Sequence, residues 1–420
     1  MSSKSLQAEQ SRTVVVGAGI VGVSTALWLS RAGKQVTLID RLAPGEGTSH
    51  GNGGVLASCA IVPVTSPGLV GKAPRLLMNA EFPLFLRWSY LPKLAPWLRR
   101  YLSFANDADT RRIAEHLKFV VGDSVEQHQD LAGNTNADKW LVPSDYQFAY
   151  RTRADYEADA YTWSLRRDNG FVPELVEGPA VQEKEPVLGP EIKCLAVVKN
   201  HGHIRSPGLY VKSLAEVFLE QGGQILQADV HDFELSDGKV SSVVTSEGSI
   251  RCDSVVLAAG VWSGVLGKKL GIKIPMESER GYHVIFKDPS SNLNSPTMVA
   301  SGKFVATPMH DGMRCAGIVE FGGLEAGPSK KPIELLMRHV KNTFPDMTYS
   351  DTVEWLGHRP APADSLPFIG QIRQTGIYTA FGHHHIGLTG GAKTGRLVAD
   401  IVCGEEPSPE LDAFRPDRFN

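Results

Sequence analysis

The chain has 420 residues, of which 42% are hydrophobic, and its formal net charge is −3. This length predicts two domains, each with its own hydrophobic core. A net charge so near neutral excludes a nucleic-acid partner, because such a partner needs a broad basic face.

The N-terminal segment, the hydropathy and the cysteines together predict a cytoplasmic protein. Residues 1–12 are polar and lack the apolar stretch of a signal peptide. No run of about 18 apolar residues occurs, so we expect no transmembrane helix. Five cysteines stand far apart without a C-x-x-C pair, which suits a reducing compartment and gives no disulfide framework.

The first predicted elements form a βαβ unit. Residues 13–17 are an apolar run that ends in glycine, typical of a buried parallel strand. Residues 20–32 carry apolar residues at helical spacing, and Gly33 ends this predicted helix. Residues 35–40 make a second strand, so a βαβ opening occupies about 30 residues.

The turn between the first strand and the helix reads Gly17-Ala18-Gly19-Ile20-Val21-Gly22. This G-x-G-x-x-G pattern, in its strand–turn–helix context, predicts a dinucleotide-binding loop whose amides face a pyrophosphate. Asp40 ends the second strand, and its carboxylate can accept both ribose hydroxyls, which favours FAD or NAD over NADP. Arg41 either contacts the adenosine edge or is a solvated surface charge.

Residues 41–75 form a predicted loop rich in Gly, Ser, Pro and Asn. Within it, Thr48 is followed by Ser49-His50-Gly51-Asn52-Gly53-Gly54. Small residues with free backbone amides can run along a pyrophosphate and reach a flavin. NAD dehydrogenases have no obvious use for such a segment, so it favours FAD over NAD.

Residues 81–132 are predicted to be largely helical, and Trp, Leu, Phe and Arg are interleaved in 81–104. Two interpretations of 81–104 remain. The favoured one is a pair of amphipathic helices packed inside a domain and broken at Pro92 and Pro96. The other is a peripheral contact with the inner face of a membrane.

Further helices and buried strands alternate toward the C-terminus, whereas short strands dominate 273–327. The predicted helices are 207–221, 332–343 and 392–403, and the predicted strands are 224–230, 254–259 and 376–381. This order predicts an α/β fold that is α+β overall.

Several of these segments resemble the D-amino-acid oxidase superfamily of FAD-dependent oxidoreductases. The matching residues are the 17–22 loop, Asp40, 49–54, Val255 to Gly260 with Trp262, Gly357-His358-Arg359-Pro360 with Asp364, Pro367 and Gly370, and Gly382 to Thr389. Within the superfamily the chain is most similar to the small subunit of bacterial D-amino-acid dehydrogenase and to D-hydroxyproline dehydrogenases. It departs from that subunit in 49–54, where Ala often replaces Gly.

The resemblance implies two interleaved domains. A Rossmann-like FAD-binding domain is expected at 10–60, 200–265 and 352–420. A substrate-binding domain built on an antiparallel sheet is expected at 61–199 and 266–351.

The resemblance also implies which residues contact the cofactor. Val230 would meet the adenine through its backbone, and Gly387, Leu388 and Thr389 would offer backbone groups to the flavin pyrimidine ring. Trp262 is expected either to cap the strand end at Gly260 or to be a core residue. The complete expected set is Gly17, Ala18, Gly19, Ile20, Val21, Gly22, Asp40, Arg41, Thr48, Ser49, Asn52, Gly53, Gly54, Val230, Gly260, Trp262, Gly387, Leu388 and Thr389.

Three residues are expected at the substrate. The resemblance implies that Arg359 holds the substrate carboxylate through two parallel hydrogen bonds, the alternative being an ion pair with Asp364. Tyr282, in the segment Arg280-Gly281-Tyr282-His283 that matches a cavity wall of the group, is expected to hydrogen-bond the carboxylate or line the cavity. His50 is expected over the flavin near the amine, and a structural role is the alternative for both. Arg280 is expected to be solvated, the alternative being a second cation at the substrate.

The run His383-His384-His385 raises the question of a metal. Adjacent histidines on an extended segment point to opposite sides, and no Cys or acid stands at zinc spacing, so we expect no metal. Two of the three are expected near the flavin or the substrate.

The implied reaction is FAD-dependent oxidation of a D-amino acid, D-proline and D-hydroxyproline included, to the imino acid. A hydride passes from Cα to flavin N5, and the electrons go on to a quinone-type acceptor. One alternative is a glycine- or sarcosine-type amine oxidase that uses oxygen. The other is a non-catalytic FAD subunit of an electron-transfer complex. Either a homo- or a hetero-oligomer is compatible with these functions.

Overall fold

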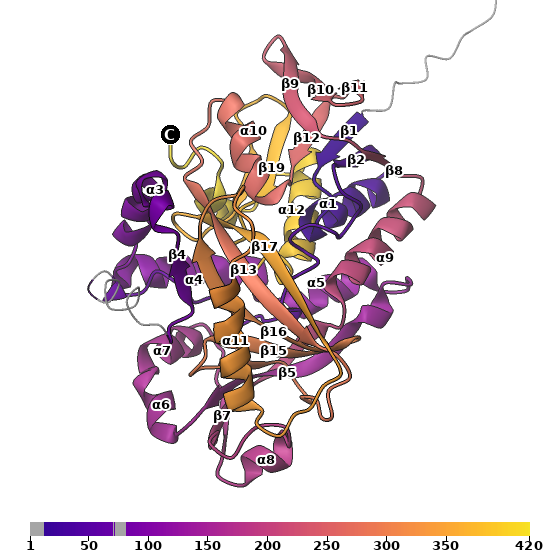
Figure 1. Cartoon of the computed structure of the whole chain (residues 1–420). Helices are drawn as coiled ribbons and strands as arrows, with labels where there is room; N and C mark the ends of the chain where they lie inside the picture. The colour runs from indigo at the N-terminus through magenta and orange to yellow at the C-terminus, as the bar shows by residue number, and fades with distance from the viewer. Residues whose placement is uncertain (1–11, 70, 72–80) are drawn as a thin grey trace, which may run out of the picture.

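A computed structural model describes residues 12–69, 71 and 81–420 of the chain (Figure 1). Residues 1–11 of the polar N-terminal segment, for which no signal peptide was expected, therefore lie outside the described residues. Within the described residues the strands form three sheets, of six, three and ten strands. This mixture of helices and sheets confirms the predicted fold class.

The six-stranded sheet carries the predicted βαβ unit. Its order is β18 (Phe368–Gln371), β19 (Ile377–Phe381), β12 (Ser254–Leu257), β1 (Arg12–Val16), β2 (Gln35–Asp40) and β8 (Gln224–Gln227). All neighbours are parallel except β18 and β19. Both faces are covered, which explains why these strands are almost uniformly apolar.

Helices cover one face of this sheet and a small sheet covers the other. The helical layer contains α1 (Ile20–Arg31), α4 (Asp107–Val121), α5 (Ser124–Ala132), α9 (Pro207–Glu220) and α12 (Gly391–Val402). Figure 1 shows α1 beside α12. The opposite layer contains β9 (Val230–Ser236), β10 (Lys239–Thr245), β11 (Gly248–Arg251) and α10 (Ser263–Lys269).

The ten-stranded sheet lies beside this layered unit. Its main path is β17 (Thr352–Pro362), β13 (Met276–Phe286), β16 (Gly312–Phe321), β15 (Phe304–Met309), β14 (Thr297–Val299), β5 (Leu141–Tyr150), β7 (Cys194–Ile204) and β3 (Val55–Leu56). Two strands pair off this path, namely β4 (Leu84–Leu86) with β16 and β6 (Glu174–Glu177) with β7.

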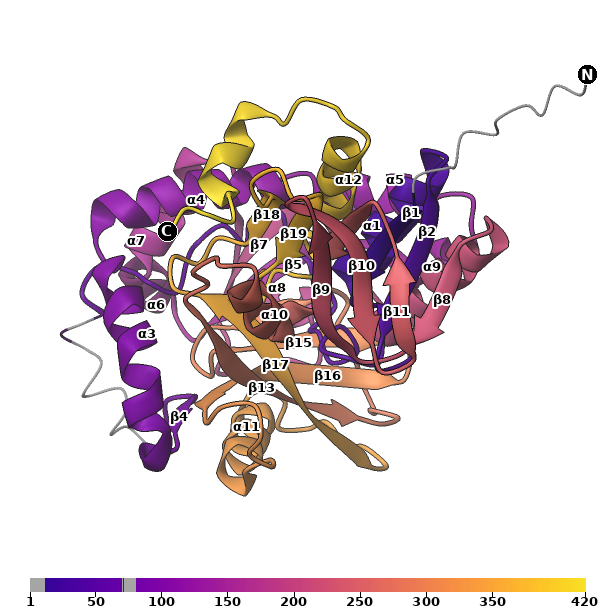
Figure 2. The same ribbon diagram turned by 90° about the horizontal axis from the view of Figure 1, so that it is seen from above.

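One long helix covers the outer face of the ten-stranded sheet. Figure 2 shows α11 (Lys330–Thr343) on the outer side of β13 and β17, away from the six-stranded sheet. Its Leu335 and Leu336 share a core with Tyr282 and Val284 of β13. The remaining helices are α3 (Leu91–Ser103), α6 (Arg153–Ala158), α7 (Ala160–Asp168) and α8 (Ala180–Lys184).

The predicted helices at 20–32, 207–221, 332–343 and 392–403 are confirmed within two residues. The division between the two large sheets differs from the expected segments at several places. Three segments expected with the nucleotide-binding part belong to the ten-stranded sheet, namely 55–56 in β3, 200–204 in β7 and 352–362 in β17. Helices α4 and α5, expected with the substrate-binding part, pack in the core around α1.

The prediction of two helices broken at Pro92 and Pro96 is wrong. The segment contains β4, a 3₁₀ turn and the single helix α3, with Pro92 in its first turn and Pro96 inside it. A proline in the first turn loses no helical hydrogen bond, so Pro92 begins the helix instead of breaking it. The helix tolerates Pro96 because its apolar face is anchored, with the Trp97 indole donating to the Ala361 carbonyl at 3.0 Å.

Among the described residues, no helix has both the length and the hydropathy needed to cross a membrane. The apolar face of α3 is accounted for by packing, because Leu94, Trp97 and Tyr101 are buried against Ala361 and Ala363.

Candidate active site

The glycine-rich turn connects β1 to α1, and two of its glycines are required by close packing. Gly17 has φ +111°, and a Cβ there would lie 2.4 Å from the Ala258 carbonyl oxygen. A Cβ at Gly22 would lie 1.8 Å from the Gly17 carbonyl oxygen. Gly19 is different, because the nearest atom to its Cβ position is Ser49 Oγ at 3.1 Å. Gly17 and Gly22 therefore shape the turn, while Gly19 keeps the start of α1 open to a ligand.

Asp40 ends β2 and ties the turn to the second strand. Its Oδ2 accepts a hydrogen bond from the Ala18 amide at 2.7 Å, and its Oδ1 accepts one from the Leu42 amide at 2.9 Å. Ser49 Oγ accepts one from the Ile20 amide at 3.0 Å, at the first residue of α1. The long loop is therefore held against the amino end of the helix, where backbone N–H groups favour an anion.

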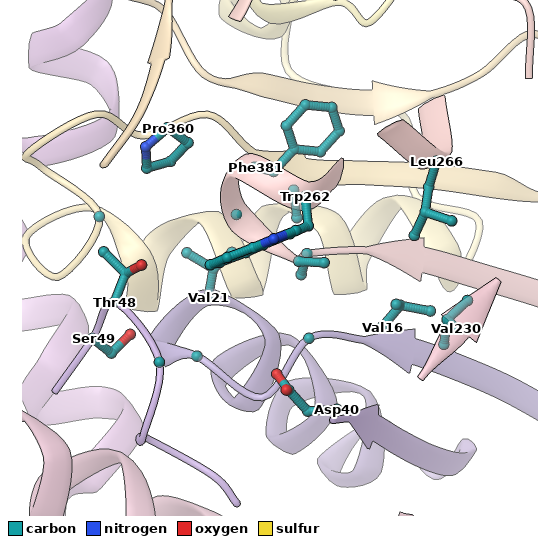
Figure 3. A pocket seen from close by; sticks show the side chains of 18 of the residues that line it. Val16, Val21, Asp40, Thr48, Ser49, Val230, Trp262, Leu266, Pro360 and Phe381 are labelled. Carbon is teal, nitrogen blue, oxygen red and sulfur yellow. The ribbon is translucent and has the colours of Figure 1, made fainter. Parts of the chain in front are cut away.

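These segments enclose an elongated cavity of about 470 Å³ at the carboxyl ends of the parallel strands. Figure 3 shows its wall, with Asp40 and Val230 toward one end and Thr48 and Pro360 toward the other. In this view the Trp262 indole lies between Phe381 and Asp40. The Arg41 guanidinium stacks over that indole, with 4.1 Å from its Cζ to the ring centroid.

Most of the predicted cofactor residues line this cavity. They are Gly17, Gly19, Ile20, Val21, Asp40, Arg41, Thr48, Ser49, Asn52, Val230, Gly260, Trp262, Gly387 and Leu388. The others, Ala18, Gly22, Gly53, Gly54 and Thr389, are not among its lining residues.

The 49–54 segment is fixed from the ten-stranded sheet. Arg314 Nη1 donates to the carbonyls of His50 at 2.9 Å and Asn52 at 2.7 Å, and Thr307 Oγ1 donates to the Gly53 carbonyl at 2.7 Å. Burial lowers the pKa of Arg314 to about 10, so the guanidinium remains a cation at neutral pH. No sequence pattern singled out Arg314 or Thr307, because their partners are distant backbone carbonyls.

The 387–389 segment is fixed from the helical layer. His128, on α5, hydrogen-bonds the Tyr210 hydroxyl through Nδ1 and the Leu388 carbonyl through Nε2, each at 2.8 Å. Thr389 Oγ1 donates to the Val55 carbonyl at 3.1 Å. Two loops far apart in the sequence are thereby joined beside the cavity.

The cavity fits the dinucleotide part of FAD by size and by chemistry. Its volume is in the range of small-molecule sites. Gly19 lies at the amino end of α1, where a phosphate would approach and a side chain would obstruct it. The Asp40 carboxylate lies at the end of β2, where ribose hydroxyls would bind. The apolar side chains of Val16, Val230 and Leu266 near that end suit a flat base.

Arg359 directly precedes Pro360, which lines the cavity, but is not itself among the lining residues. Its Nη1 donates to Glu279 Oε1 at 2.8 Å, and 19% of the side chain is exposed. The predicted alternative, a pair with Asp364, is wrong, because that carboxylate binds Arg418 at 2.7 Å. Arg359 therefore has a partner that the sequence reasoning missed, although Glu279 directly precedes the segment singled out at 280–283.

Tyr282 does not line the cavity, because it lies on the opposite face of β13. Side chains alternate along a strand, so Glu279, Gly281 and His283 face the site, whereas Arg280 and Tyr282 face α11. The Tyr282 hydroxyl donates to Glu320 Oε2 at 2.6 Å. Burial, followed by the hydrogen bond to Glu320, raises the pKa of Tyr282.

The expectation of a solvated Arg280 is wrong. Its side chain is fully buried, and its Nε lies 3.3 Å from Glu320 Oε2. The Arg280 guanidinium lies on the α11 side of the sheet because side chains alternate along β13, as for Tyr282.

His50 is exposed and is not among the residues that line the cavity. Its ring lies near Trp355, with 6.2 Å between the ring centroids. Its Nδ1 lies close to Gly208, only 2.7 Å from where a Cβ would be if that residue had a side chain. Trp355 in turn stacks on His283 at 5.1 Å. His283 was expected only as part of the 280–283 segment, and no sequence pattern indicated Trp355.

The three adjacent histidines do not alternate as an extended segment would. His384 has φ +51°, which turns the chain, so the rings of His384 and His385 lie together at 4.8 Å between centroids. His383 points elsewhere, and its Nε2 hydrogen-bonds Thr394 Oγ1 on α12 at 2.9 Å. His383 and His384 line the cavity. In the described part of the chain, no group of three or more His, Cys, Asp or Glu residues could hold a metal ion.

Comparisons with known proteins agree with this geometry. The family described as "DAO: FAD dependent oxidoreductase" matches residues 12–401. The D-amino-acid oxidase of Bradyrhizobium diazoefficiens is 38% identical over 419 residues, which cover 98% of this chain and 99% of the relative. The D-amino acid dehydrogenase of Paramagnetospirillum magneticum is 29% identical over 431 residues, which cover 97% of this chain and 99% of the relative.

Solved structures show the same fold. The glycine oxidase of Geobacillus kaustophilus superposes with a TM-score of 0.73 at 20% identity, covering 98% of this chain and 100% of that one. At this identity the similarity concerns the fold and not the substrate.

Proposed function

The chain belongs to the DAO family of FAD-dependent oxidoreductases, and we propose that it oxidises a D-amino acid to the corresponding imino acid. The names of two relatives that match almost the whole chain support this substrate class. The observation that carries the proposal is the partly exposed Arg359 guanidinium. It is paired with Glu279, which hydrogen-bonds His384, a residue of the cavity lining. Such a guanidinium suits an α-carboxylate.

When bound, FAD supplies the acceptor for the hydride that leaves Cα. The protein then has to bind, orient and shield the substrate. Arg359 Nη1 is paired with Glu279, and no other hydrogen bond of this guanidinium occurs among the described residues. Its remaining N–H groups are therefore available for the substrate carboxylate, and holding that group at a fixed point orients the rest of the substrate.

We test the substrate class by mixing the flavin-loaded protein with single amino acids in the absence of oxygen. Loss of the flavin absorbance near 450 nm is expected with one or more D-amino acids and not with their L-enantiomers, which serve as the matched controls. D-Proline and D-hydroxyproline belong in this panel, because a cyclic secondary amine is the narrower expectation. A panel that leaves the flavin oxidised throughout would favour the non-catalytic FAD subunit.

For the electron acceptor we propose a quinone-type molecule. A relative named dehydrogenase supports an acceptor other than oxygen, whereas the relative named oxidase supports oxygen itself. Hydrogen peroxide measured during turnover in air separates the two. Stoichiometric peroxide identifies an oxidase, and turnover that requires an added quinone analogue identifies a dehydrogenase.

A further inference from the structure

Glu279 is a buried carboxylate held between two basic side chains. Its Oε1 accepts the hydrogen bond from Arg359 Nη1, and its Oε2 accepts one from His384 Nε2. The side chains of Glu279 and His384 are 9% and 4% exposed. Burial opposes ionisation, but His384 and Arg359 hold the pKa of Glu279 well below its usual range. A charge buried at this depth is retained only where its partners are fixed.

The backbone around His384 holds this residue against the end of β17. Its φ of +51° is uncommon for a residue other than glycine, and such conformations persist where the surroundings enforce them. The His384 amide donates a hydrogen bond to the carbonyl of Pro360 at 2.9 Å, and Pro360 is the residue directly after Arg359. The loop at 382–385 and the strand that carries Arg359 are therefore one connected unit.

The sheet also leaves room for the arginine. Gly281 lies on the same face of β13 as Glu279, two residues further along. A Cβ at Gly281 would lie 2.5 Å from Arg359 Cζ. The guanidinium therefore lies over a position without a side chain, and Glu279 fixes one of its edges.

We propose that Glu279 and His384 are positioning residues, which orient Arg359 so that its free N–H groups meet the substrate carboxylate. This inference rests on the proposed function, because it takes Arg359 as the carboxylate-binding group. It also assigns a role to one member of the histidine run. Fixing a flexible guanidinium before the substrate arrives removes part of the entropy cost of binding.

The test is the dissociation constant of propionate, a carboxylate without an amine, for the FAD-loaded protein. Binding is followed through the change in the flavin spectrum, so it does not require turnover. We expect Arg359→Ala to raise this constant strongly, and Glu279→Ala to raise it at least tenfold. A smaller rise is expected for Glu279→Gln, which keeps a hydrogen-bond acceptor for Arg359. Flavin content and the thermal midpoint of each variant report folding.

Two comparisons separate positioning from a general structural role. Glu279→Ala should add nothing in an Arg359→Ala background if Glu279 acts through Arg359. Added guanidinium should restore propionate binding to Arg359→Ala when Glu279 is present, and not when Glu279 is also replaced. His384→Gln, which keeps an N–H donor, should bind propionate more tightly than His384→Ala.

Glu277→Ala is the matched control, because Glu277 lies on the same strand and hydrogen-bonds Tyr90 instead of Arg359. Its propionate affinity should equal that of the unmodified protein. An unchanged constant in Arg359→Ala would overturn the proposed role of Arg359 itself. A large effect of Arg359→Ala combined with equal or tighter binding in Glu279→Ala would overturn only the positioning role.

Discussion

Gly281 and Gly357 face each other across the antiparallel pair β13 and β17, and each lies beneath a large side chain. Arg359 covers Gly281, and the Trp355 indole covers Gly357, where a Cβ would lie 1.9 Å from the ring. The two glycines thus allow a cation and an aromatic ring to lie close to the same sheet.

Replacing Gly281 with alanine should displace Arg359, because the new methyl group would lie 2.5 Å from the guanidinium carbon. We expect the KM for the best amino acid to rise about tenfold or more, in line with a strained contact costing 1–3 kcal/mol. Steady-state kinetics measure this. Gly327→Ala is the control, since a Cβ there would meet nothing within 4 Å. Equal KM values for the two variants would contradict the packing argument.

Two glycines of the 17–22 turn should respond differently to alanine. Gly22→Ala forces a methyl group to 1.8 Å from the Gly17 carbonyl oxygen, so the apoprotein should lose stability by several °C in thermal midpoint. Gly19→Ala should leave the apoprotein near its original midpoint and reduce FAD binding, because Gly19 lines the cavity. Thermal unfolding of the apoprotein and flavin titration measure the two effects. The reverse pattern would contradict the roles assigned here.

Asp40→Ala should weaken FAD binding. The carboxylate lines the cavity and accepts the amides of Ala18 and Leu42, so its loss removes both a ribose partner and the order of the turn. Hydrogen bonds to a charged group are worth about 1.5–3 kcal/mol, which corresponds to a rise of roughly 10- to 100-fold in the dissociation constant. Titration of the apoprotein with FAD measures this dissociation constant. Affinity within twofold of the original would refute the assignment.

The protein should lose stability in mild acid because several histidines are buried in the neutral form. Burial lowers the pKa of His128 to about 4 and that of His383 to about 3, from an ordinary value of 6.5. Below pH 6.5 these histidines bind protons in the unfolded chain and not in the folded chain, so the free energy of unfolding decreases as the pH is lowered. At pH 5 each of the two histidines lowers the free energy of unfolding by about 2 kcal/mol.

Urea unfolding at pH 7 and pH 5 measures this effect. His128→Gln should be less stable than the original protein at pH 7, because it disturbs the bonds to Tyr210 and Leu388. It should nevertheless lose less stability between the two pH values, since glutamine does not titrate. An equal acid-induced loss in both proteins would show that His128 is not a source of the pH dependence.

Local patterns in the sequence were sufficient to predict the dinucleotide end of the site. The strand, glycine turn, helix and terminal acid at 13–40 are adjacent in the chain, and their contacts are set by local geometry. The helices at 207–221 and 392–403 were also predictable, because their apolar periodicity and end signals are local.

The substrate end depended on contacts between distant segments. Glu279, Arg359 and His384 come from three segments, and only the register of β13 against β17 places the first two together. Tyr282 has the structural role that was the alternative, because the phase of β13 relative to the site cannot be read from 280–283 alone. The alternation expected for 383–385 failed because His384 has a left-handed backbone conformation, which forms a turn instead of an extended segment.

The most direct test of the central claim is the anaerobic reaction of the FAD-loaded protein with paired D- and L-amino acids. We expect that at least one D-amino acid bleaches the flavin and that its L-enantiomer does not. Arg359→Ala should need much more of the D-amino acid for the same rate. Bleaching by L-amino acids alone, or an unchanged concentration dependence in Arg359→Ala, would contradict it.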